Sequence, residues 1–84
     1  MADIETDMWV LVDVKGDIFI GVVLQVFLSV GAAKVKLFEK PYGVKGPQRF
    51  ENVKFWVKYP LEKLFFFCPV TPHQVSDGSD KWQY

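Results

Sequence analysis

The sequence predicts an all-β fold: a small SH3-like five-stranded barrel with one short 3-10 turn before the last strand. Residues 18–27 are the longest uninterrupted apolar stretch, and their Ile, Val and Phe side chains fit a pleated strand better than a helix. Both alternating faces of this stretch are apolar, so the rest of the chain must wrap around it. Shorter runs of period two flank it, separated by glycine and proline.

The composition indicates one small domain. Half of the 84 residues are hydrophobic, including eight Phe, three Trp and three Tyr, so a core can form without disulfides. The single cysteine, Cys68, cannot form an internal disulfide, which favours a reducing compartment. The acidic N-terminus lacks the basic and apolar segments of a signal peptide. We therefore expect an intracellular protein, nuclear or cytoplasmic.

One uncharged stretch, residues 18–33, raises the question of a membrane segment. A spanning helix needs about 20 apolar residues, and this stretch is shorter and contains Gly21, Gln25, Ser29 and Gly31. Its β-branched residues favour a strand. We expect no membrane segment.

The first half of the domain is predicted as a hairpin and a long strand. Residues 1–7 form a flexible acidic N-terminus, and the barrel covers residues 8–68. Residues 8–14 alternate with period two and form the first strand, and Gly16 supplies the positive φ of a tight turn. Gly21 marks a bulge in the long second strand or a close approach of another backbone.

The second half is predicted as three further strands and a tail. Residues 33–38 form the third strand, with Ala33, Val35 and Leu37 inward and Lys34 and Lys36 outward. A loop rich in Pro and Gly, residues 40–48, leads to a fourth strand over residues 49–59, with Asn52 marking an irregularity between two pieces. Residues 59–64 form one helical turn and residues 65–68 the closing strand. Residues 69–84 form an extended C-terminal tail, from which Trp82 and Tyr84 can pack back on the barrel.

Two segments resemble known modules. Residues 7–23, DMWVLVDVKGDIFIGVV, look like the opening hairpin of Tudor, chromo-barrel and PWWP-type modules, and residues 59–64, YPLEKL, are similar to the turn before the last strand of many Tudor domains. The Pro-Trp-Trp-Pro signature and the Ala-Leu-Tyr-Asp-Tyr run of peptide-binding SH3 domains are absent. The resemblance covers roughly the barrel residues and implies an SH3-like barrel that recognises a protein or peptide, as chromatin-binding modules do.

The resemblance also implies a candidate ligand site. Tudor-like modules can hold a methylated lysine or arginine in a cage of aromatic rings through cation–π attraction. The candidate cage residues here are Trp9, Asp13, Asp17, Phe19, Tyr42, Phe55 and Trp56. The alternative for these rings is ordinary core packing.

The uneven charge suggests a second class of function. The net charge is zero, yet residues 34–63 hold eight basic and three acidic side chains, and residues 1–33 hold five acidic side chains and one lysine. Basic residues interleaved with an aromatic ring can bind nucleic acid, and the candidates are Lys34, Lys36, Lys54 and Lys58. The alternative is that these lysines are solvated and balanced in space by the acidic end.

The number of aromatic residues suggests an interface. Phe27, Phe38 and Trp56 fall opposite the core sets of their strands, and an exposed aromatic patch binds a protein partner or a second copy of the chain. A homodimer would satisfy the same pattern.

No catalytic constellation is present in the sequence. His73 has no neighbouring Cys or second His for a metal site, and Cys68 lies in an aromatic run without a base beside it. No Gly-rich phosphate loop opens a helix. We therefore expect a non-enzymatic interaction module that needs no metal and no cofactor, with a protein or peptide ligand first and nucleic acid as the alternative.

Overall fold

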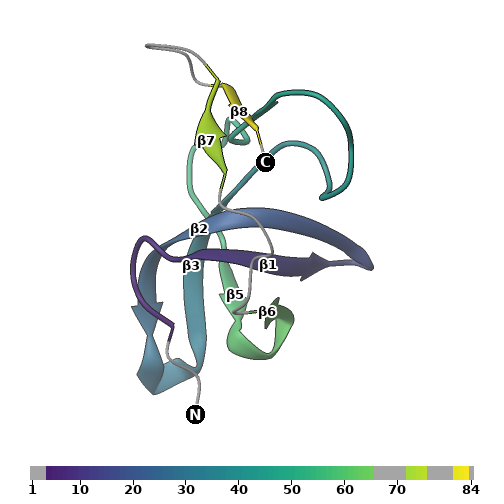
Figure 1. Cartoon of the computed structure of the whole chain (residues 1–84). Coiled ribbons are helices and arrows are strands. Elements are labelled where there is room, and N and C mark those ends of the chain that lie inside the picture. Colours follow the sequence, from purple (N-terminus) through teal and green to yellow (C-terminus); the bar gives the residue numbers. More distant parts are fainter. Residues whose placement is uncertain (1–3, 66–71, 76–80, 84) are drawn as a thin grey trace.

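The computed structural model, which describes residues 4–65, 72–75 and 81–83, confirms the all-β class (Figure 1). A five-stranded antiparallel sheet in the order β5-β3-β2-β1-β6 curls into a half-barrel, and a three-stranded sheet in the order β4-β8-β7 lies at one end of it. The strands are β1 Trp9–Val14, β2 Asp17–Phe27, β3 Ala32–Leu37, β4 Gln48–Arg49, β5 Lys58–Pro60, β6 Leu64–Phe65, β7 His73–Gln74 and β8 Lys81–Gln83. Two 3-10 turns, η1 Leu28–Val30 and η2 Leu61–Lys63, precede β3 and β6.

The predicted first hairpin is confirmed, and its loop has two residues. Lys15 and Gly16 have φ angles of 52° and 91°, and Val14 pairs with Asp17 on either side of them. Two positive φ values match the type I′ turn, which fits the twist of a hairpin. The Gly16 N–H donates a 3.0 Å hydrogen bond to Asp13 Oδ1. Asp13 therefore helps to fix the turn.

The long second strand is also confirmed, and of the two roles expected for Gly21 the structure shows the close approach of another backbone, whereas the bulge lies further along the strand. A Cβ atom at Gly21 would lie 2.6 Å from the side chains of Val35 and Leu37 and 2.8 Å from the Lys36 carbonyl oxygen. The register between β2 and β3 then shifts between Val23 and Gln25, which marks a bulge. The close approach and the bulge together bend β2 around the core.

The inner face of the curled sheet forms the main core. Ala33, Val35 and Leu37 point inward as predicted and are buried. Among the described residues, the buried members of this cluster are Ile4, Val10, Val12, Val23, Ala33, Val35, Leu37 and Leu64. Ile4 belongs to the segment that we expected to be flexible, and the Asp7 N–H donates a 2.8 Å bond to the Val23 carbonyl. One apolar side chain in an acidic run gives no periodic signal, so the sequence did not indicate this anchoring.

The fourth strand differs from its prediction. The pairs Phe38↔Phe50 and Lys34↔Lys58 show that two pieces of chain run along the same edge of β3. The two pairs are four positions apart along β3 and its continuation but eight positions apart on the other piece of chain, which therefore holds four extra residues between them. The irregularity at Asn52 and the division into two pieces are thus confirmed, but the strand character predicted for residues 53–57 is wrong. Residues 52–57 are named the bulge segment.

The C-terminal half of the domain ends in short elements. The turn before the last strand is confirmed as η2, which Pro60 precedes with a φ of −58°. Leu64 and Phe65 form β6 beside β1, whereas residues 66–68 of the predicted strand, including Cys68, lie outside the described residues. Within the expected tail, β7 and β8 pair with each other and β8 pairs with β4. Tyr84 lies outside the described residues.

Trp82 of β8 packs on the outer face of the large sheet. Trp9, Phe38, Phe50 and Trp82 form the aromatic cluster, in which the ring centroids of neighbouring pairs lie 4.8 to 6.4 Å apart. Phe38 is only 1% exposed. Phe38 does point away from the main core, but the second sheet covers it, so the expectation that it belongs to an exposed patch is wrong.

Tyr59 gives the stability of the domain a dependence on alkaline pH. Burial and then the Glu51 carboxylate raise the pKa of the Tyr59 phenol above its ordinary value of about 10. The folded state favours the neutral phenol, so this stabilisation is complete below about pH 10 and is lost as the pH rises through the folded-state pKa. We expect the urea midpoint of the wild type to fall more steeply above about pH 10 than that of Tyr59→Phe. Tyr42→Phe is the matched control, and parallel curves for wild type and Tyr59→Phe would contradict the prediction.

Candidate functional site

Trp9 and Phe19, the first two candidate cage rings, lie on opposite faces of the sheet. Trp9 pairs with Val22, whereas Phe19 pairs with Val12 of the buried core. Paired residues share a face and neighbours alternate, so the two rings cannot line one cage. The Trp9 ring stacks on Phe50 at 6.0 Å and 11°, a distance of direct contact between rings. Trp9 therefore serves the packing of the aromatic cluster.

The other cage candidates are spread over three segments. Asp13 and Asp17 lie at the first hairpin, and Asp13 accepts the Gly16 N–H. Tyr42 lies in the loop after β3, where its N–H donates a 2.7 Å bond to the Ile18 carbonyl. Phe55 and Trp56 lie in the bulge segment. The structure brings Trp9 together with Phe38, Phe50 and Trp82 instead, and the methyl-lysine or methyl-arginine cage stays a prediction.

Three of the four candidate lysines share one face of the large sheet. Lys34 and Lys36 are two residues apart on β3, so both side chains point to the outer face. Lys58 lies directly opposite Lys34 in the β3–β5 pair. Side chains opposite one another start about 5 Å apart at Cβ, so the Lys34 and Lys58 side chains leave the sheet next to each other. We name this set, Lys34, Lys36 and Lys58, the lysine face.

Aromatic rings support two of these lysines. Lys36 Nζ lies 4.1 Å from the centroid of the Phe50 ring, and Lys58 Nζ lies 4.4 Å from that of Phe27. Both distances are within the range of a cation–π contact. The rings hold the ammonium groups in place without neutralising their charge, so the face stays positive.

The cross-strand neighbours of the lysine face add no negative charge. Lys34 lies between Gln25 on β2 and Lys58 on β5, and Lys36 lies opposite Val22. Like charges directly opposite one another destabilise a sheet by roughly 0.2–1 kcal/mol. The pair Lys34↔Lys58 therefore costs stability when no anion is bound.

The bulge segment lies beside the lysine face, because it leaves and rejoins the edge of β3 at the position of Lys36. Glu51 N–H donates to the Leu37 carbonyl before the bulge, and Val35 N–H donates to the Val57 carbonyl after it. The ring of Phe55 is 77% exposed, and Lys54 Nζ lies 5.6 Å from its centroid. The fourth candidate lysine thus belongs to a segment whose two ends are bonded to the β3 edge on either side of Lys36, and this segment carries an exposed aromatic ring.

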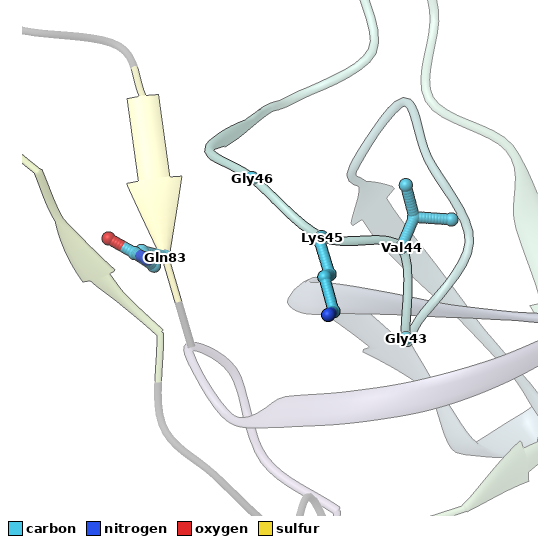
Figure 2. Close-up of a pocket in the computed structure, with 5 residues that line it drawn as sticks. All are labelled: Gly43, Val44, Lys45, Gly46 and Gln83. Carbon is cyan, nitrogen blue, oxygen red and sulfur yellow. The ribbon is translucent and has the colours of Figure 1, made fainter.

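Described residues of the second sheet take part in the lining of two pockets. Residues Gly43, Val44, Lys45 and Gly46 face Gln83 of β8 across a pocket of about 350 Å³ (Figure 2). Figure 2 shows that the Val44 and Lys45 side chains leave this loop on opposite sides. A pocket of about 280 Å³ is lined by Glu39, Lys40, Pro47, Arg49 and Lys81. Sequence reasoning missed Lys81 as a site residue, because only the pairing of β4 with β8 brings it to Arg49.

No protein-family model, curated protein or solved structure matches the chain. The described part of the chain contains no group of three or more His, Cys, Asp or Glu side chains that could hold a metal ion. No helix within residues 4–65, 72–75 and 81–83 is long and apolar enough to cross a membrane. The proposals below therefore rest on the geometry of the site alone.

Proposed function

We propose that this protein is a non-enzymatic interaction module that binds nucleic acid through the lysine face. The observation that supports the proposal is the gathering of Lys34, Lys36 and Lys58 on one outward face whose cross-strand neighbours are uncharged. Closely spaced lysines bind phosphates by releasing condensed counterions. A bound phosphate backbone also removes the repulsion between Lys34 and Lys58.

The sequence favours a protein or peptide ligand, whereas the arrangement of side chains supports the alternative, nucleic acid. The candidate cage rings Trp9 and Phe19 lie on opposite faces of the sheet, whereas three of the four candidate lysines share one face. Binding of a protein or peptide and formation of a homodimer stay predictions, because the arrangement of these side chains speaks neither for nor against them.

Single-stranded nucleic acid fits this surface better than a duplex. Single strands are bound by a positive surface that follows the backbone together with exposed rings on which bases stack. Phe55 is exposed beside the lysine face and has Lys54 next to it. A base stacked on Phe55 would place its phosphate within reach of Lys54, whose Nζ lies 5.6 Å from the ring centroid.

We further propose that the half-barrel is of the SH3-like type. Its strand order β5-β3-β2-β1-β6 and the turn η2 before β6 support this assignment. The Tudor-like relationship suggested by residues 7–23 and 59–64 is part of the same proposal. An experimental structure in which β5 and β6 lie on distant edges of an open sheet would contradict it.

The double variant Lys34→Gln/Lys58→Gln tests the proposed function. Each phosphate contact on a single strand adds about 0.7 to the slope of log K against log salt, so we expect the slope to fall by about 1.4. The affinity for a fluorescently labelled single-stranded oligonucleotide is measured by anisotropy between 50 and 200 mM salt. The variant also loses the repulsion between Lys34 and Lys58, so its urea midpoint is expected to stay at or above that of the wild type.

The matched control is Lys15→Gln/Lys63→Gln, which removes the same charge from the first hairpin and from η2. It should keep the wild-type slope. The proposal fails if the wild type binds no oligonucleotide at 50 mM salt, or if both double variants lose affinity equally. A duplex bound more tightly than a single strand would refute the role of Phe55.

A further inference from the structure

The bulge in β2 decides the direction of the Gln25 side chain. Val23 is buried on the inner face, where it lies opposite Val35. Gln25 is exposed and lies opposite Lys34 of the lysine face. Residues two apart on a regular strand share a face, so without the bulge Gln25 would point into the core beside Val23. Bulges are frequent next to functional sites, where they re-aim a side chain, and this bulge places an amide among the lysines.

An apolar row crosses the outer face next to this amide. Phe27 pairs with Ala32, and Ala32 pairs with Pro60, so the three residues lie in one line across β2, β3 and β5. We name them the apolar row. Its members are two residues away on their strands from Gln25, Lys34 and Lys58, respectively. Both lines of residues therefore share one face and lie about 7 Å apart, a distance comparable to the width of a nucleobase.

A lysine accompanies the ring of the apolar row, just as Lys54 accompanies Phe55 in the bulge segment. Lys58 Nζ lies 4.4 Å from the centroid of the Phe27 ring, and the Lys58 side chain is exposed. A base that contacts Phe27 therefore has a cation within reach of its phosphate. The Phe27 position also has the exposed amide of Gln25 two residues away on the same face.

We propose that Gln25 is a base-reading residue of the nucleic-acid site, with the base lying against the apolar row and adenine as the preferred base. This inference rests on the proposed function of the lysine face. An amide presents a hydrogen-bond donor beside an acceptor. Adenine matches this pattern with its amino group and a ring nitrogen on both its Hoogsteen and its Watson–Crick edge, and unstacked bases of single strands are read on both edges. Guanine and the pyrimidines match it on the Watson–Crick edge alone.

The test compares two labelled single strands of equal length, one of adenine and one of thymine, by fluorescence anisotropy at low salt. We expect the wild type to bind the adenine strand about tenfold more tightly, because a bidentate contact discriminates between bases. Gln25→Leu should remove this preference and keep the dependence of the affinity on salt, since every lysine remains. Gln83→Leu, the matched control on β8, should keep the preference.

A second variant tests the apolar row. Phe27→Leu keeps an apolar side chain but loses the ring, so it should weaken the binding of both strands about fivefold or more. Unchanged affinities in Phe27→Leu would contradict the placement of the base on this row.

The outcomes separate this subsite from the proposed function. Equal affinity of the wild type for the two strands overturns the subsite and leaves the proposed function standing. An adenine preference that persists in Gln25→Leu also overturns it, because the preference then arises from the strand itself. If the wild type binds neither strand, the proposed function fails and the subsite fails with it.

Discussion

Replacing Gly21 by valine is expected to destabilise the domain by about 3 kcal/mol, because the new side chain overpacks the core. The Cβ atom alone would lie 2.6 Å from the side chains of Val35 and Leu37 and 2.8 Å from the Lys36 carbonyl oxygen. The side-chain tips can move, but the carbonyl belongs to the backbone of β3. Relief therefore requires the separation of β2 from β3 next to the lysine face.

Urea unfolding measures this effect as a lower midpoint with an unchanged slope. Gln25→Val is the matched control, since it adds a valine to an exposed position of the same strand. Combining Gly21→Ala with Leu37→Ala should cost less than the sum of the single changes, because the smaller side chain makes room for the methyl group. Equal midpoints for Gly21→Val and Gln25→Val would show that the close approach at Gly21 does not limit stability.

Local patterns predicted those parts of the fold that local geometry determines. Period-two alternation identified the inward set Ala33, Val35 and Leu37, and Gly16 identified the first turn. The fourth strand was misplaced because the bulge segment keeps an alternation of lysine with apolar residues although it leaves the sheet. Such a bulge depends on pairing with β3, which is not visible in the segment itself.

The features of the candidate sites likewise fall into those that follow from local sequence spacing and those that depend on the pairing of distant strands. The shared face of Lys34 and Lys36 follows from their spacing, whereas Lys58 meets Lys34 only because of the register after the bulge segment. The opposite faces of Trp9 and Phe19 were open to prediction, because a two-residue turn at Lys15 and Gly16 fixes the register of the hairpin. No local pattern could bring a residue of the C-terminal segment to a residue of β4.

Trp82→Ala is expected to destabilise the whole domain by about 3 kcal/mol. This value is near the lower end of the range for replacing a large aromatic residue by alanine, because the Trp82 ring is only half-buried. Its ring contacts Trp9 at 5.4 Å and Phe50 at 5.6 Å between centroids. Phe38, which is 1% exposed, loses part of its cover. The measurement is urea unfolding together with amide hydrogen exchange, with Gln83→Ala as the matched control on the same strand.

The exchange data decide whether the second sheet is part of the cooperative unit. If it is, Trp82→Ala lowers protection in β1 and β2 as well as in β8, because the aromatic cluster joins the outer face of the large sheet to the second sheet. If protection falls in β8 alone and the midpoint stays unchanged, the second sheet is an independent appendage and the 3 kcal/mol expectation is refuted.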